Sequence, residues 1–246
     1  MNDRLKNSVA LVTGASSGIG ETTALALADQ GATVALVARR QDRLRAVADR
    51  IAEGPGDALV LEGDITDHAR ARRVVDDVVD RFGQLDILVN CAGTASLDPV
   101  EEASVEDWQI MVHTNLLGLM YCCHAALPSL LAAAEGPHGV ADLVNISSVA
   151  GRKTRVGNSV YAATKHGVGA FSESLRQEVT ERHVRVGLIE PGMVTTEMTG
   201  SPAENPDSDF TWLEPVDVAE AVVFVVSRPA RAAVNEVLIR PTEQQR

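Results

Sequence analysis

A glycine turn between a short apolar run and a helical segment constrains the fold of this 246-residue chain more than any other feature. Residues 9–12 are apolar, the turn follows over 13–20, and an Ala- and Leu-rich helical segment begins at 21. Gly14 permits a sharp turn, Gly18 lets a phosphate approach the backbone, and Gly20 lets the helix pack close to the strand. Free amides at the helix start then face a pyrophosphate. The pattern predicts a dinucleotide-binding unit.

Apolar runs and helical segments alternate along the rest of the chain. Further strands are expected at 32–37, 58–64, 85–90, 142–146, 184–189 and 236–239. Helices are expected after residue 40, through 74–82, at about 105–130, around 161–182 and at 216–226. Such alternation is typical of right-handed βαβ units. We therefore predict the α/β class, with one doubly wound Rossmann domain over 1–246 and helices on both faces of a seven-stranded parallel sheet.

The end of the second predicted strand bears on the choice of cofactor. A dinucleotide-binding fold presents at this distance an acid that reads the ribose 2′-hydroxyl, or an arginine that reads a 2′-phosphate. Here the strand runs into Ala38, Arg39 and Arg40 without an acid. Because Arg39 can make a charge-assisted contact to a phosphate, we predict NADP(H) rather than NAD(H). The alternative is that both arginines begin the solvated face of the next helix, with Arg43 and Arg45.

A tyrosine and a lysine are the first candidates for chemistry. Tyr161 and Lys165 are four residues apart in a predicted helix and would share one face. A free phenol titrates near pKa ~10, and a neighbouring ammonium lowers that value. We therefore expect Lys165 to lower the pKa of Tyr161 and fit it for general acid–base work. The spacing alone also suits an amphipathic surface helix. Ser147 and Ser148 lie shortly upstream.

Taken together, these features resemble the short-chain dehydrogenase/reductase family over essentially the whole chain. The motifs that carry the resemblance are the turn at 13–20, Asp64, Asn90-Cys91-Ala92-Gly93, Asn115, Ser148, Tyr161, Lys165 and Pro191-Gly192. Segments 115–121, 170–178 and 239–243 look like a narrower group of NADPH-dependent members that includes clavulanate dehydrogenase (clavaldehyde reductase).

Two positions depart from the family pattern. Cys91 stands where the family's Asn-Asn-Ala-Gly motif has its second Asn. The glycine turn holds Ser16 and Ser17 and no basic residue, which weakens the argument for NADP(H).

The resemblance implies a catalytic set of Asn115, Ser148, Tyr161 and Lys165. Tyr161 would exchange the proton with the substrate oxygen while hydride moves to or from nicotinamide. Ser148 would hydrogen-bond that oxygen, with Ser147 as the less favoured candidate that caps or faces the sheet. Lys165 would also bind the nicotinamide ribose, and Asn115 would anchor a water leading from Lys165 towards solvent. An asparagine inside a helix can instead make only a local backbone bond.

The resemblance also implies which residues contact the cofactor. Asp64 and Ile65 would contact the adenine, and the segment after the fourth strand would contact the ribose and pyrophosphate. The cofactor-binding set is Gly14, Ser16, Ser17, Gly18, Ile19, Gly20, Arg39, Arg40, Asp64, Ile65, Asn90, Ala92, Gly93, Tyr161, Lys165, Pro191, Gly192 and Thr196.

Composition and charge limit the partners. The formal net charge of −12 repels nucleic acid and acidic carrier proteins. We expect no stretch long and apolar enough to span a membrane, no signal peptide and a cytoplasmic location. The three cysteines show no disulfide or zinc spacing, so we expect buried thiols and no metal site.

The substrate is the least constrained part of the prediction. Residues 193–214 are expected to form a lid, whose aromatic side chains either contact substrate or anchor the loop. A basic segment holds Arg152, Lys153 and Arg155, and Arg155 is our candidate for attracting a substrate carboxylate. The alternative is a solvated loop or subunit contact. The substrate candidates are Ser148, Arg155, Met193 and Trp212.

The sequence thus predicts an NADP(H)-dependent oxidoreductase acting on a carbonyl or alcohol of a small, acidic metabolite, in antibiotic or other secondary metabolism. The alternatives are a 3-ketoacyl-carrier-protein reductase, a β-hydroxy acid dehydrogenase, a dinucleotide-sensing regulatory protein, or an interaction protein built on this fold. The resemblance also implies a homotetramer packed through the helices at 105–130 and 161–182.

Overall fold

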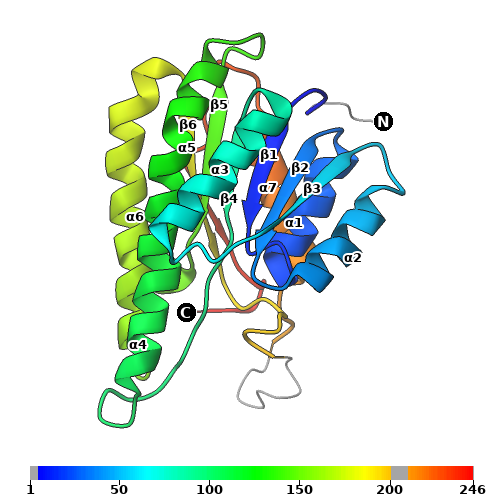
Figure 1. Cartoon of the computed structure of the whole chain (residues 1–246). Helices are drawn as coiled ribbons and strands as arrows, with labels where there is room; N and C mark the ends of the chain where they lie inside the picture. The colour runs from blue at the N-terminus through cyan, green and yellow to red at the C-terminus, as the bar shows by residue number, and fades with distance from the viewer. Residues whose placement is uncertain (1–4, 201–209, 246) are drawn as a thin grey trace.

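The computed structural model of the chain describes residues 5–200 and 210–245, and its centre is a parallel sheet (Figure 1). The seven strands lie in the order β3-β2-β1-β4-β5-β6-β7. Their bounds are β1 (Val9–Thr13), β2 (Thr33–Ala38), β3 (Asp57–Glu62), β4 (Ile87–Asn90), β5 (Ala141–Ile146), β6 (Val184–Pro191) and β7 (Glu236–Ile239). The order reverses direction between β1 and β4, where an open α/β sheet places its ligand crevice.

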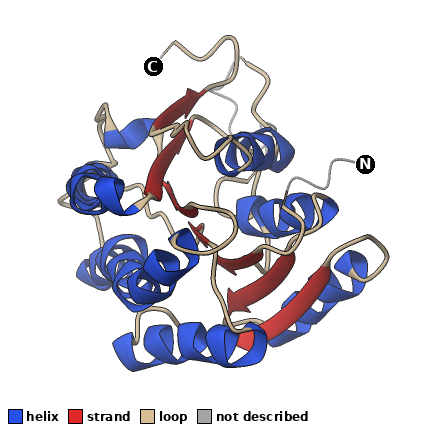
Figure 2. Ribbon diagram, turned by 90° about the horizontal axis from the view of Figure 1, so that it is seen from above, coloured by secondary structure: helices blue, strands red, loops and turns tan. Residues whose placement is uncertain are grey.

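Helices cover both faces of the twisted sheet (Figure 2). One face packs against α1 (Gly18–Asp29), α2 (Gln41–Ile51) and α7 (Pro215–Val226), and the other against α3 (His68–Phe82), α5 (Leu119–Ala134) and α6 (Ser159–Val179). Each face buries its own apolar cluster. The predicted doubly wound fold and seven-stranded parallel sheet are confirmed, and each predicted strand overlaps the observed one.

The long helix predicted at 105–130 is a composite. It begins as α4 (Val105–Val112), passes through a π-helical turn, η1 (His113–Gly118), and continues as α5. Ser104 caps its start by accepting the amide hydrogen of Asp107. π-turns inside α-helices are rare and occur frequently at functional sites. Asn115 lies in this turn.

The same composite helix corrects one expectation from the sequence. Residues Val105–Ala134 are long and apolar enough to cross a membrane by length and composition. In the fold, however, α5 places Leu119, Cys122, Ala126 and Leu130 in the cluster beneath the sheet. Its hydropathy is therefore that of a helix packed against a sheet face.

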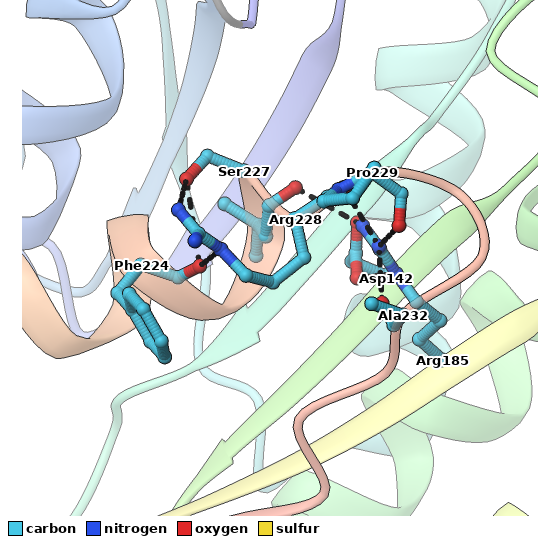
Figure 3. Close-up of polar contacts among 8 residues, drawn as sticks. Asp142, Arg185, Phe224, Ser227, Arg228, Pro229 and Ala232 are labelled. Carbon is cyan, nitrogen blue, oxygen red and sulfur yellow. Dashed lines mark hydrogen bonds and ion pairs between the residues drawn. The ribbon is translucent and has the colours of Figure 1, made fainter.

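A buried ion pair ties the two strands at the centre of the C-terminal half (Figure 3). Arg185 on β6 donates to both carboxylate oxygens of Asp142 on β5, at 2.8 and 2.7 Å. It also donates to the carbonyls of Val226, Arg228 and Ala232, at 3.0, 2.9 and 2.9 Å. Since these contacts lie at the start of β5 and β6, they anchor the chain after α7 to the amino end of the sheet.

Candidate active site

A cleft of about 590 Å³ lies at the carboxyl ends of the strands. Its walls come from the β1–α1 turn, the ends of β2, β4, β5 and β6, the start of α6 and the segment after β6. Thr13 joins the end of β1 to the segment after β4 across the strand-order reversal, because its hydroxyl accepts the amide hydrogens of Cys91 and Ala92, both at 3.2 Å. The crevice therefore lies where the topology predicts a nucleotide.

The glycines of the β1–α1 turn are required by close backbone approaches. Gly14 has φ +67°, and a Cβ there would lie 2.8 Å from the Cα of Ala92. A Cβ on Gly20 would lie 2.3 Å from the carbonyl oxygen of Gly14. Gly18, at φ +55°, faces Thr196 across the cleft and opens α1. The turn therefore leaves the amide groups at the start of α1 on the cleft side, where they can hold an anion.

Two arginines after β2 line the cleft, and they differ in their partners. Arg39 makes no hydrogen bond or ion pair with any described residue, so its guanidinium remains free for a ligand. Arg40 folds back over the glycine turn and donates to the hydroxyls of Ser16, at 3.2 and 3.0 Å, and of Ser17, at 2.7 Å. Ser16 and Ser17 thus hold the guanidinium of Arg40 against a turn that contains no basic residue of its own.

Tyr161 and Lys165 both line the cleft from the first turns of α6. The Lys165 ammonium is 5.7 Å from the centroid of the Tyr161 ring and donates to the carbonyl of Ile146 at 3.0 Å. Lys165 is only 6% exposed, and it forms no ion pair with a described acid. Burial lowers the pKa of Lys165 to about 8, a change that the thiol of Cys91 opposes.

The pKa of Tyr161 corrects an expectation from the sequence. Burial of the phenol raises its pKa above the ordinary value. A hydrogen bond with Ser148 and the charge of Arg155 act in the opposite direction without reversing the shift. The expected net lowering by Lys165 is therefore wrong for this arrangement, because desolvation of the phenol outweighs the hydrogen bond with Ser148 and the charge of Arg155. The raised pKa favours the neutral phenol, which is the form that donates a proton.

The two neighbouring serines at the end of β5 have different hydrogen-bond partners. Ser147 is 4% exposed and its hydroxyl donates to the carbonyl of Lys165 at 3.2 Å, which ties β5 to α6. Ser148 begins the next turn, where its hydroxyl accepts the amide hydrogen of Ala150 at 3.1 Å, and it meets the phenol of Tyr161. A structural role for Ser147 agrees with the sequence-based choice of Ser148 as the substrate contact.

Asn115 holds the loop after β4 against the catalytic helix. Its side-chain oxygen accepts the amide hydrogen of Thr94 at 2.8 Å, and its amide donates to the carbonyl of Thr94 at 2.9 Å and the hydroxyl of Thr164 at 3.3 Å. A Cβ on Gly93 would lie 3.4 Å from the Asn115 oxygen and 3.9 Å from the Lys165 nitrogen. Asn115 is thus close to Lys165, and its role in anchoring a water remains a prediction.

Most of the predicted cofactor-binding residues do line the cleft. They are Gly14, Ser16, Ser17, Gly18, Ile19, Gly20, Arg39, Arg40, Asp64, Ile65, Ala92, Gly93, Tyr161, Lys165, Pro191, Gly192 and Thr196. Asn90 is the exception. It is 2% exposed, and its amide donates to Asn145 at 2.9 Å and to the sulfur of Cys123 at 3.3 Å. Asn90 therefore joins β4 to β5 and α5 inside the fold and does not face the cleft.

The predicted substrate residues are only partly brought to the site. Trp212 is 4% exposed and is absent from the cleft walls, so it anchors its loop. Met193 is also absent from the walls, and its amide donates to Gln244 at 3.1 Å. Arg155 acts on Tyr161 through its charge from outside the cleft. Residues 201–209 of the predicted lid lie outside the described residues.

The basic segment between Ser148 and Tyr161 is partly neutralised. Arg152 pairs with the buried Glu190, its Nε lying 2.6 Å from a carboxylate oxygen, and with Glu236. Arg155 has no such acidic partner among the described residues. Of the two arginines, only Arg155 therefore retains a charge available to an anionic ligand.

Several cleft residues were not among the predicted site residues, although two of them lie in the predicted lid. Thr94, Ala95 and Thr114 line the side nearest Asn115, and Glu197 and Met198 line it directly after Thr196. The methyl group of Met198 lies 3.8 Å from the Cβ position of Gly93. The available signal for Glu197 and Met198 was their position directly after Thr196, a predicted cofactor-binding residue. Among the described residues, no group of three or more His, Cys, Asp or Glu is placed to hold a metal ion.

Comparison with known proteins identifies relatives over nearly the whole chain. Residues 8–207 match the family model described as short chain dehydrogenase. An uncharacterized oxidoreductase of Staphylococcus epidermidis is 38% identical over 239 residues, which cover 97% of this chain and 99% of that protein. A second, from Staphylococcus saprophyticus, is 37% identical over 96% of this chain and 98% of its own length.

Solved structures give the same result. A serine dehydrogenase in its closed form with NADP⁺ is 35% identical, with a TM-score of 0.88, and the match covers 97% of this chain and 96% of that one. An alcohol dehydrogenase from the archaeon Thermococcus sibiricus, complexed with 5-hydroxy-NADP, is 28% identical, with a TM-score of 0.87 and coverage of 97% and 98%.

Proposed function

Since this chain belongs to the short chain dehydrogenase family, we propose that it is an NADP(H)-dependent oxidoreductase that interconverts a carbonyl and an alcohol of a small metabolite. One observation carries the proposal: Ser148, Tyr161 and Lys165 line the same cleft as the glycine turn. A dinucleotide held by its phosphates at the turn would thus have its other end beside a proton donor. Bound NADPH supplies the hydride, and the chain's own residues manage the proton.

The side chains suggest how the proton moves during carbonyl reduction. The Ser148 hydroxyl donates a hydrogen bond to the substrate oxygen and holds the carbonyl carbon at a fixed position. As hydride reaches that carbon, negative charge develops on the oxygen, and Tyr161 gives up its phenolic proton to it. The ammonium of Lys165 stabilises the phenolate left behind. The products are an alcohol and the oxidised cofactor, and reprotonation of Tyr161 restores the site.

The preference for NADP(H) is supported by charge at the cleft. Arg39 lines it without a partner among the described residues, and no acid stands at the end of β2 to accept a hydrogen bond from a ribose hydroxyl. The related structures described above hold NADP⁺ or 5-hydroxy-NADP. We extend that preference to this chain.

We further propose a β-hydroxy acid as the substrate class. Arg155 has no acidic partner among the described residues, and its charge reaches Tyr161, so it is placed to attract a carboxylate near the reacting oxygen. The serine dehydrogenase relative is named for a substrate that is itself a β-hydroxy acid. A carrier-bound ketoacyl substrate is less compatible with a net charge of −12.

Other features of the enzyme also stay proposals. These are a clavulanate dehydrogenase-like aldehyde reductase in secondary metabolism, a homotetramer, a cytoplasmic location, and a single domain over 1–246 with a lid at 193–214. The segments at 115–121, 170–178 and 239–243 support the first of these.

A substrate panel tests the reaction class. NADPH oxidation is measured with aldehydes, ketones and β-keto acids, and NADP⁺ reduction with alcohols and β-hydroxy acids, each acid alongside its methyl ester. We expect turnover, with the free acid preferred over the ester by wild type and the preference lost in Arg155→Gln. Equal kcat/KM for acid and ester would remove Arg155 from the proposal, and no turnover across the panel would contradict the reaction.

Cofactor choice is tested by Arg39→Ala. The wild type should use NADPH with a much lower KM than NADH, and the variant should lose affinity for NADPH by about tenfold or more while its KM for NADH changes little. Equal use of both cofactors by the wild type would contradict the preference.

A further inference from the structure

The segment after β6 reaches across the cleft to the arginines after β2. Glu197 accepts a hydrogen bond from Arg40 at 2.9 Å and also pairs with Arg43 at the start of α2. These partners are 157 and 154 residues away in sequence. Glu197 therefore connects the segment after β6 to the segment after β2 across the cleft.

The local fold after β6 holds Glu197 in this position. Thr196 is bridged to Gly200, whose amide donates to the Thr196 carbonyl at 2.9 Å, and the hydroxyls of Thr196 and Thr199 lie 2.9 Å apart. Val194 is bridged to Leu213. The turn at 196–200 thus presents Glu197 over the phosphate end of the cleft.

Arg40 is shared between this carboxylate and the glycine turn. Its Nε and Nη2 donate to Ser16 and Ser17, while Nη1 donates to Glu197. Glu197 and Arg39 line the same cleft. The Glu197 carboxylate, paired with Arg40 and Arg43, occupies a position that the oxygens of an anionic phosphate could take. The side chains of Arg40, Arg43 and Glu197 are between 42% and 53% exposed, so another anion can reach the position.

We propose that Glu197 is a specificity-determining residue for the cofactor, whose carboxylate holds the anion position beside Arg40 and is displaced by the 2′-phosphate of NADP(H). NAD(H), which has no 2′-phosphate, does not compete for that position. Glu197 thereby limits the affinity for NADP(H). This inference rests on the proposed function.

The test compares Glu197→Gln with wild type in direct binding. The variant keeps the shape of the side chain and removes its charge. Dissociation constants are measured for NADPH, NADH, adenosine 2′,5′-bisphosphate and 5′-AMP, of which the last two need no turnover. We expect Glu197→Gln to bind NADPH and the bisphosphate about three- to tenfold more tightly, with smaller gains at high salt, and NADH and 5′-AMP unchanged.

Glu173→Gln is the matched control. Glu173 is an exposed acid paired with Arg176 on α6, so the variant makes the same change in net charge away from the cleft. Its affinities should equal those of wild type. Unchanged or weaker NADPH binding by Glu197→Gln, or an equal gain for NADH, overturns the inference. A wild type that binds NADPH no more tightly than NADH instead contradicts the proposed cofactor preference.

Discussion

Each end of the sheet buries a cation, and the two cations differ in how many hydrogen-bond acceptors surround them. At the amino end, Arg185 is 8% exposed and is surrounded by acceptors, with Asp142 and a set of carbonyls around its guanidinium (Figure 3). At the carboxyl end, Lys165 is 6% exposed and has one hydrogen bond, to the carbonyl of Ile146. Arg185 is therefore committed to the protein, whereas Lys165 keeps donors free for a ligand. The contrast places a structural cation at one end of the sheet and, at the other, a cation with donors available to a ligand.

The largest expected effect is on stability, at the amino end. Arg185→Met leaves the Asp142 carboxylate buried without its partner, which should lower the free energy of unfolding by about 3–5 kcal/mol. Denaturant unfolding measures this. Turnover per folded molecule should stay close to wild type, since Arg185 is absent from the cleft walls.

Two further variants sharpen that result. Replacing both partners in Asp142→Leu/Arg185→Met should recover much of the lost stability, because no buried charge then remains unpaired. Arg176→Met, at an exposed arginine, should change stability by less than about 0.5 kcal/mol. A single Arg185 variant as stable as wild type would contradict the structural role.

The next largest expected effect is at the carboxyl end of the sheet, where the substitution should raise the free energy of unfolding. Lys165→Met removes a buried ammonium that lacks an acidic partner among the described residues, so stability at pH 7 should rise by about 2–3 kcal/mol. Turnover should fall by at least about 10²-fold. Unfolding and steady-state kinetics on the same sample measure both. A variant less stable than wild type would show that Lys165 belongs with Arg185 as a structural cation.

The last prediction concerns how the difference in unfolding free energy between Lys165→Met and wild type depends on pH. The pKa of Lys165 in the folded state, about 8, lies below its ordinary value of 10.5, so the folded protein binds fewer protons between these values. The free energy of unfolding of the wild type therefore rises, relative to that of the variant, as the pH increases from about 8 to 10.5. The stability advantage of Lys165→Met should be full below about pH 8 and shrink towards pH 10.5. A constant difference would place the pKa of Lys165 near its ordinary value.

Much of this arrangement was predictable from the sequence because it depends on local pattern. Apolar runs, turn glycines and helical spacing predicted the sheet, and family motifs placed Ser148, Tyr161 and Lys165 in one cleft. The misplacement of Asn90 has a simple cause: side chains alternate along a strand, and Asn90 shares with Leu88 the face that α5 covers.

The rest depends on contacts that spacing does not encode. The pairing of Glu197 with Arg40 joins distant segments, and the sequence between them does not predict it. The direction of the Tyr161 pKa shift depends on how much water the fold removes from the phenol, which an i,i+4 spacing does not reveal.

Tyr161→Phe tests the claim that Tyr161 donates the proton at the carboxyl end of the sheet. The variant keeps the ring and removes only the hydroxyl. Turnover with the best substrate of the panel and the dissociation constant for NADPH are measured together. We predict a loss of turnover of about 10²- to 10⁴-fold, with NADPH binding within about threefold of wild type. Turnover retained at the wild-type rate would contradict the claim.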